Sequence, residues 1–178
     1  MTKLGASALR CYSLKNSQGR SAVLLSDTFV LNAPQGAVWE ALMDAEAIRA
    51  ASGVHQLVPV AGQARTWRAT VRFSLLNNTS SYLVQMSEVD APHSYRLSVR
   101  GEGRHSLLSG SGVIRLSALE DGRTQLHWRA EGVFAGALRL IAPLLVQQTV
   151  SALSYAFFSR LEAHVSARHA QSLLTANS

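Results

Sequence analysis

The chain has 178 residues, and 17 lysine and arginine residues against 11 aspartate and glutamate residues give it a net charge of +6. This length is typical of one domain, which buries about 70% of the surface of its unfolded chain. Hydrophobic residues make up 47% of the sequence and charged residues 16%, which excludes an intrinsically disordered chain. So small a share of charged residues also argues against nucleic-acid binding, because that affinity depends on many contacts to phosphates.

The positive charge is concentrated at the N-terminus. Residues 1–20 contain four basic residues and no acidic one, so they carry +4 of the net charge and residues 21–178 carry +2. We predict that residues 1–20 form a flexible basic extension. We further hypothesise that this extension attracts an anionic membrane, because each basic residue close to such a surface contributes about 1 kcal/mol.

The sequence points to a reducing compartment. Cys11 is the one cysteine of the chain, so no intrachain disulfide can form. No apolar run near the N-terminus has the pattern of a secretory signal. The most apolar stretch, residues 138–158, is better explained as a buried helix than as a membrane span, since it is interrupted by Arg139, Pro143, Gln147 and Gln148. We therefore expect a cytoplasmic protein with peripheral contact to the inner face of the membrane.

The first elements are a strand and two short helices. Residues 21–32 are apolar and then alternate, which predicts a strand. A first helix is expected over residues 34–43, because proline suits the first turn. Asp44 is a good N-cap for a second helix over residues 45–51, and the pair Ser52-Gly53 ends that helix.

The middle of the chain predicts an antiparallel sheet with one wet face. Apolar and polar residues alternate along successive segments from residue 67 to residue 134, which indicates about six further strands. Turn signals separate these segments at Asn77-Asn78, Ala91-Pro92 and Asp121-Gly122. Strands grouped in this way, without alternating helices, favour an α+β fold.

A long helix is predicted at the C-terminal end. The apolar spacing becomes helical near Ala137 and continues to Val165. Pro143 fits either the first turn of this helix or a kink. From residue 143 to residue 165 the helix would measure about 34 Å, long enough to cross a sheet. The expected organisation is one domain over residues 21–165, a curved sheet of about seven strands around this helix, followed by a frayed polar tail over residues 166–178.

The alternation assigns an apolar, uncharged inner face to the sheet. Such a face either packs as a filled core or lines a ligand cavity, typically of about 300–1,000 Å³, and both interpretations remain open from the alternation alone. In a cavity, the tyrosine hydroxyl and tryptophan N–H groups would provide polar contacts. The predicted lining residues are Trp67, Val71, Phe73, Tyr82, Met86, Tyr95, Leu97, Val99, Ile114, Leu116, Trp128 and Phe134, with Leu145 from the helix.

No catalytic or metal-binding pattern is recognisable, so we expect no catalytic residue, metal or cofactor. The glycine pairs at 101/103 and 110/112 lack the spacing of a phosphate loop, and we interpret them as bends that let the sheet curl. Ser109 and Ser111 do not form a nucleophile elbow, and HExxH and CxxC motifs are absent. Glu88 has inner-face parity, but it lies near a strand end, where a rim position is expected.

Several segments together resemble a known family. The opening Phe29–Pro34 segment with Val38-Trp39 and Leu42-x-Asp44 is similar to the start of the SRPBCC (START-like, helix-grip) superfamily. Within it, the closest resemblance is to CoxG-like proteins, the family of the G-type subunit of carbon monoxide dehydrogenase. The paired glycines, the strand from Thr124 to Glu131 and the helix end Phe157-Phe158-x-x-Leu161 also fit, so that the resemblance covers about residues 22–165. The chain departs from the family's pattern at Ser52-Gly53, where Pro-Gly is usual, and at Leu75-Leu76, where Gly-Pro is usual.

The resemblance implies a START/Bet v 1-like helix-grip fold with a hydrophobic cavity. It also implies a non-catalytic accessory role near molybdenum-containing dehydrogenases, linked to membrane recruitment. Our first hypothesis is accordingly a non-enzymatic carrier for a lipid- or quinone-like ligand. The alternatives are a polyketide cyclase- or dehydratase-like enzyme, with Tyr82, Tyr95 and Glu88 as acid–base groups, and a pure interaction module that docks a dehydrogenase through its surface.

Overall fold

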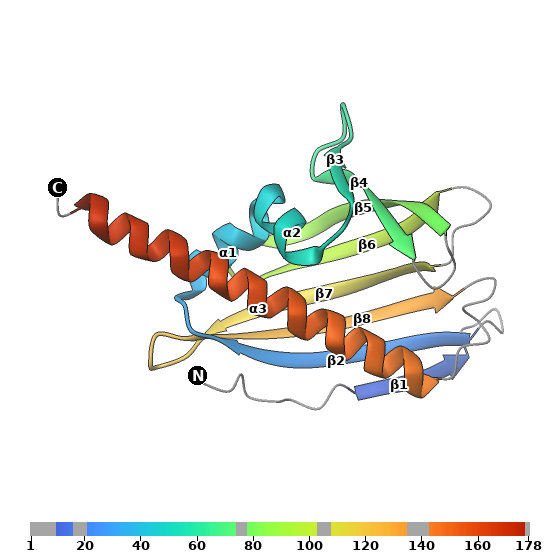
Figure 1. The fold of residues 1–178 in the computed structure, drawn as a ribbon. Helices are drawn as coiled ribbons and strands as arrows, with labels where there is room; N and C mark the ends of the chain where they lie inside the picture. The colour runs from blue at the N-terminus through green and yellow to red at the C-terminus, as the bar shows by residue number, and fades with distance from the viewer. Residues whose placement is uncertain (1–9, 16–20, 74–77, 103–107, 135–142, 177–178) are drawn as a thin grey trace.

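One antiparallel sheet carries three helices on the same face (Figure 1). The computed structural model describes residues 10–15, 21–73, 78–102, 108–134 and 143–176. The strands, in the spatial order β1-β2-β8-β7-β6-β5-β4-β3, are β1 Arg10–Lys15, β2 Ser21–Leu31, β3 Gln56–Pro59, β4 Thr66–Phe73, β5 Asn78–Asp90, β6 Ser94–Glu102, β7 Leu108–Ala118 and β8 Thr124–Phe134. The helices are α1 Gln35–Met43, α2 Ala45–Ser52 and α3 Pro143–Ala176.

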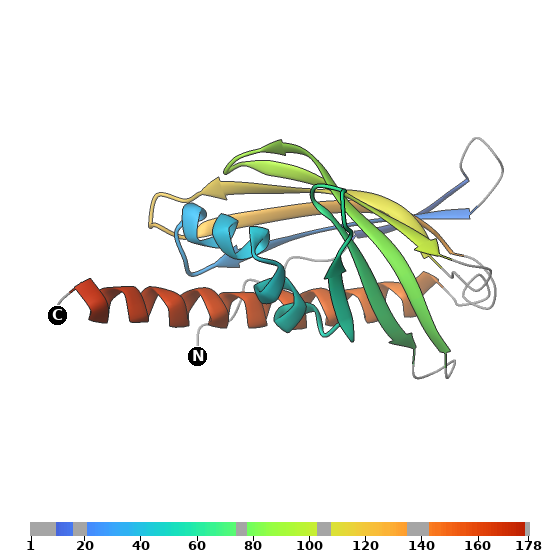
Figure 2. The ribbon, with the colours of Figure 1, turned by 90° about the horizontal axis from the view of Figure 1, so that it is seen from above.

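The predicted α+β helix-grip architecture is confirmed. Strands β2 to β8 supply the seven expected strands. Figure 2 shows the sheet curving so that β4 and β5 bend toward the side on which α3 lies. The antiparallel meander from β3 to β8 leaves β2 beside β8, so the first long strand closes the sheet next to the last one.

Strand β1 contradicts the prediction of a flexible extension over residues 1–20. It pairs with β2 in the described range Arg10–Lys15, with Cys11 opposite Leu25. The physical reason is that β2 would otherwise present an edge of unpaired backbone N–H and C=O groups, which β1 satisfies. Six residues are too few to show the period-two pattern that identifies a strand from the sequence alone.

The C-terminal tail was also predicted wrongly. Helix α3 continues from Pro143 to Ala176, whereas fraying was expected from residue 166. Val165 is buried, and the guanidinium Nη1 of Arg168 donates a hydrogen bond to Asp44 Oδ2 at 3.1 Å. These contacts hold the helix against α2 beyond the predicted end.

Local signals set several element boundaries where they were predicted. The Asp44 carboxylate accepts hydrogen bonds from the backbone N–H groups of Glu46 and Ala47 and so caps α2, while Gly53 ends it in the left-handed conformation with φ 68°. Pro143 is the first residue of α3, as the first-turn alternative required. The turn at Asp121-Gly122 joins β7 to β8.

The core lies where α1, α2 and the second half of α3 meet the sheet. Leu126 of β8, Val38 of α1 and Leu161 of α3 are fully buried there. The rings of Phe29 and Phe158 lie with centroids 4.5 Å apart and join β2 to α3. Since this apolar contact removes several large side chains from water, it is the main stabilising contact between helix and sheet.

Polar contacts fix the position of α3 at the same end of the sheet. Arg160 donates a hydrogen bond to the carbonyl oxygen of Ala51 at the end of α2. Glu162 accepts hydrogen bonds of 2.7 Å from both the backbone N–H and the side-chain amide of Asn32. Across the described residues, α3 packs most closely on α2, α1, β2 and β1. The central strands therefore lie beneath the helix without close backbone contact.

Within the described ranges, no helix combines the length and the apolar character that crossing a membrane requires.

Candidate functional site

The concave face of the sheet, which faces α3, carries the predicted lining residues. The strand register places Tyr95, Ile114 and Trp128 side by side on β6, β7 and β8. In the same way Met86 of β5 lies opposite Leu97 of β6. The alternation of the sequence thus assigned these side chains to the correct face.

These side chains separate into a buried group and a partly exposed group. The buried group belongs to the filled core or its margin and consists of Tyr82, Met86, Tyr95 and Leu116. The partly exposed group extends away from α1 and α2 and consists of Trp67, Val71, Leu97, Val99, Ile114 and Trp128. The side chains of Phe73, Phe134 and Leu145 lie outside the described residues. The predicted set therefore includes both packed core and a partly open apolar surface.

Two glycines on the concave side of β7 are required by a close approach of β7 to β8. A Cβ at Gly110 would collide with the carbonyl oxygen of Glu131 and lie 2.9 Å from the Cα of Gly132. A Cβ at Gly112 would lie 2.9 Å from the carbonyl oxygen of Arg129. Because Gly110 pairs with Gly132, this part of the concave face has a floor without side chains. The bend predicted here is realised as a close approach of two strands.

A buried carboxylate on the concave side was missed by the sequence analysis. Asp27 of β2 is 6% exposed and shares its face with Leu25 and Phe29. Its Oδ1 accepts a hydrogen bond of 2.7 Å from the backbone N–H of Thr28. The alternation Asp27-Phe29-Leu31 was the signal that could have assigned it to this face.

Asp27 lies directly opposite Trp128 in the β2–β8 register. The indole Nε1 of Trp128 is buried and has no hydrogen-bond partner among the described residues. A buried donor without a partner costs about 1–3 kcal/mol, so this position on an otherwise apolar face calls for an explanation. A ligand acceptor would satisfy it.

Tyr95 is positioned as a neutral side chain. Its ring packs edge-on against Trp39, with centroids 5.9 Å apart, and burial raises the pKa of its hydroxyl above the usual value. The deprotonated form is therefore further disfavoured at neutral pH. Tyr95 can donate a hydrogen bond but is not suited to act as a base.

Glu88 lies at the rim, as predicted, and turns away from the concave face. A register irregularity between Ser87 and Asp90 interrupts the β5–β6 pairing, and Glu88 has a φ of 48°. Its carboxylate is mostly exposed and forms an ion pair of 2.9 Å with Arg96. The bulge thus reverses the parity that the sequence suggested, so Glu88 is not positioned as an acid–base group for the concave face. Among the described residues, no group of three or more histidine, cysteine, aspartate or glutamate side chains is arranged to hold a metal ion.

Comparison with known proteins identifies the family. The sequence model of CoxG, the G-type subunit of carbon monoxide dehydrogenase, matches residues 28–166. The chain belongs to the CoxG family. This match covers the concave face, both glycines of β7 and most of α3, and it confirms the resemblance seen in the sequence. No curated protein matches this CoxG-family chain.

Solved structures confirm the SRPBCC helix-grip fold of this CoxG-family chain. A conserved protein from Geobacillus kaustophilus is 21% identical with a TM-score of 0.72, over 79% of this chain and 93% of that one. Ara h 8.0201 is 17% identical with a TM-score of 0.64, over 82% and 99%. The Zhui aromatase/cyclase of Streptomyces sp. R1128 is 15% identical with a TM-score of 0.62, over 83% and 95%. At these identities the likeness extends to the fold alone.

Proposed function

We propose that this CoxG-family chain is a non-enzymatic carrier that holds a hydrophobic small molecule, lipid- or quinone-like, between the concave face of the sheet and α3. The observation that carries the proposal is the partly exposed apolar surface on the side of the sheet that α3 covers. Val99, Leu97 and Ile114 belong to this surface, and the side-chain-free floor at Gly110 adjoins it. In a filled core, side chains of this kind are fully buried.

The energetics favour an apolar occupant. Covering apolar surface contributes about 25 cal/mol for each Å² removed from water. The central strands offer this surface because α3 is held mainly by α1, α2 and the edge strands β1 and β2. Binding sites for small molecules are typically apolar clefts with a few placed polar groups, which is the composition of this face.

Trp128 supports a ligand with one polar end. Its buried Nε1 donor faces the apolar surface without a partner in the described part of the chain. A carbonyl oxygen, as in a quinone or a lipid ester, would accept this hydrogen bond. The polar end of the ligand would then lie beside Trp128 and Asp27, and its apolar part along the valine and glycine surface.

The family suggests where the carrier acts. We propose an accessory role with a carbon monoxide dehydrogenase-type molybdenum enzyme, including its recruitment to the membrane, in the cytoplasm at the inner membrane face. Family membership supports this role.

A cyclase- or dehydratase-like enzyme that uses the same face is the second candidate. The observation that favours it is Asp27, a carboxylate buried on the concave side. Against it stand the outward position of Glu88 and the neutral state expected for Tyr95. These leave one ionisable carboxylate where acid–base catalysis commonly uses a pair of groups.

Extraction of the purified protein tests the carrier proposal. The expected result is an apolar molecule, identified by mass spectrometry of the organic extract, in near-stoichiometric amount. A protein stripped of it should bind menadione or the neutral probe N-phenyl-1-naphthylamine. An empty extract together with no binding of either compound would refute the proposal, and a chemically altered compound recovered after incubation would favour the enzyme.

A further inference from the structure

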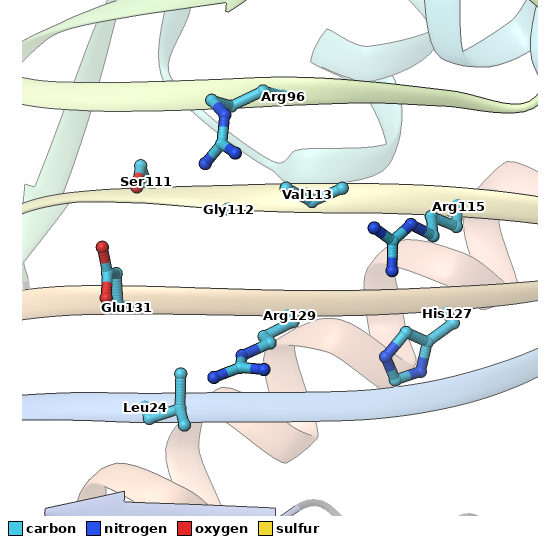
Figure 3. Close-up of a pocket in the computed structure, with 9 residues that line it drawn as sticks. All are labelled: Leu24, Arg96, Ser111, Gly112, Val113, Arg115, His127, Arg129 and Glu131. Carbon is cyan, nitrogen blue, oxygen red and sulfur yellow. The ribbon is translucent and has the colours of Figure 1, made fainter. Parts of the chain in front are cut away.

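The outer face of the sheet, opposite to α3, has a shallow hollow lined by basic side chains (Figure 3). Its volume is about 380 Å³, and it extends over β2, β8, β7 and β6. The residues that give it its character are Arg96, Val113, Arg115, His127, Arg129 and Glu131. This hollow is separate from the concave face, since the sheet lies between them.

Strand register brings the three arginines together. Val113 of β7 lies opposite Arg96 on one side and opposite Arg129 on the other. Arg115 is two residues further along β7, opposite His127. In Figure 3 the side chains of the three arginines project from three successive strands over this one area. The residues are far apart in the sequence, so the sheet alone assembles the cluster.

The cluster has unused positive charge. In the described part of the chain, Arg115 and Arg129 form no ion pair, and Arg96 pairs with the exposed Glu88. Glu131 is the one carboxylate among the residues that line the hollow. The imidazole Nδ1 of His127 and the hydroxyl Oγ1 of Thr28 lie 3.0 Å apart, which fixes the edge of the hollow. Three guanidinium groups around one carboxylate leave a site suited to additional anions.

We propose that this outer hollow is a docking site for an acidic segment of a partner protein, whose carboxylates bind Arg115 and Arg129. Arginine presents a planar set of donors that matches a carboxylate with two parallel hydrogen bonds. Charge complementarity of this kind determines the choice and orientation of a partner. The docked segment would leave the concave face accessible, so the proposal does not depend on what that face holds.

A protein segment fits the hollow better than a lipid surface. Peripheral membrane binding combines basic residues with exposed apolar side chains that enter the lipid. The exposed large apolar side chains of the described residues are Val58, Leu153 and Tyr155, and none of them lines the hollow. Its lining is polar around Val113, as expected at the rim of a protein interface.

Titration of the isotope-labelled full chain with a hexaglutamate peptide tests the proposal, with hexaglutamine as the neutral control peptide. At about 50 mM salt the backbone amide signals of Val113, Arg115 and Arg129 should shift, and binding should be lost near 0.5 M salt because exposed charges are screened. Loss of two exposed arginine–carboxylate contacts corresponds to about tenfold weaker binding, which is the result expected for the double variant R115Q/R129Q.

The variant R49Q/R123Q is the matched control, because it removes two charges from other surfaces. It should bind the acidic peptide within about twofold of the unmodified chain, as expected for charges more than a Debye length away. Equal weakening by both double variants would show a general charge effect and overturn the proposal. Absence of peptide binding, or signal shifts on other surfaces, would also overturn it. Binding to phosphatidylglycerol vesicles without binding to the peptide would assign the hollow to lipid instead.

Discussion

The guanidinium of Arg168 lies 3.1 Å from the Asp44 carboxylate whose other oxygen caps helix α2. One carboxylate therefore both begins α2 and holds the last third of α3. The cap uses Oδ1, which accepts hydrogen bonds from the backbone N–H groups of Glu46 at 2.9 Å and Ala47 at 3.4 Å, while Oδ2 accepts from Arg168. The two roles can be separated by substitution.

Asp44→Ala should lower the free energy of unfolding by about 1–2 kcal/mol, since it removes the cap. Asp44→Ser keeps a capping oxygen and loses the ion pair with Arg168, so its loss should be below about 1 kcal/mol, typical of exposed pairs. Urea denaturation measures both values. Equal destabilisation by the two variants would mean that the ion pair, and not the cap, dominates.

Thr124→Val should destabilise the protein by about 1–3 kcal/mol. The buried Thr124 hydroxyl donates a hydrogen bond of 2.6 Å to the carbonyl oxygen of Ala33, and valine of similar size would leave that acceptor unsatisfied. The matched control is Thr79→Val on β5, an exposed position, where the change should stay within about 0.5 kcal/mol. Thermal denaturation of the two variants decides this, and similar melting temperatures would contradict the prediction.

Gly110→Ala should destabilise the β7–β8 pairing by about 1–3 kcal/mol, the usual range for an added group in a packed position. The new Cβ would meet the backbone of β8 at Glu131 and Gly132, and backbone cannot yield as a flexible side chain does. Gly36→Ala in α1 is the control, because nothing lies within 4 Å of its Cβ, and it should be stabilising by about 0.4–1 kcal/mol. Unfolding free energies of opposite sign are expected, and a neutral Gly110→Ala would refute the close approach.

Val99→Trp should abolish binding of N-phenyl-1-naphthylamine with little change in the far-ultraviolet circular dichroism. The larger ring would occupy the concave surface on which the proposed ligand lies. Val113→Trp places the same ring on the outer face and should leave probe binding unchanged. Retained binding by Val99→Trp, measured by fluorescence titration, would locate the ligand elsewhere.

The pKa of Glu102 should lie below 4.5, its ordinary value, because Arg68 donates hydrogen bonds to this carboxylate at 2.8 and 3.2 Å. A folded-state pKa that is lowered gives stability above the pKa of the unfolded chain, and this contribution is lost as the pH falls through the folded value. Both side chains are solvent-exposed, so the effect on stability should be small. An NMR titration of the Glu102 carboxyl measures the shift, and Arg68→Gln should return the pKa to the ordinary value. An unchanged pKa in that variant would contradict the assignment to Arg68.

The sequence by itself determined the local elements and the faces of most strands. The cap at Asp44 and the stop at Gly53 are signals within a few residues, so they act before any tertiary contact forms. The two-residue period placed Tyr95, Ile114 and Trp128 on one face, because successive side chains of a strand point to opposite sides.

The tertiary structure alone decided which distant residues meet. Pairing joined β1 to the edge of β2, set Asp27 opposite Trp128, and gathered the arginines of the outer hollow. A bulge turned Glu88 outward although its parity pointed inward. The physical reason is that strand register depends on contacts between segments far apart in the chain, and a shift of one residue exchanges the two faces.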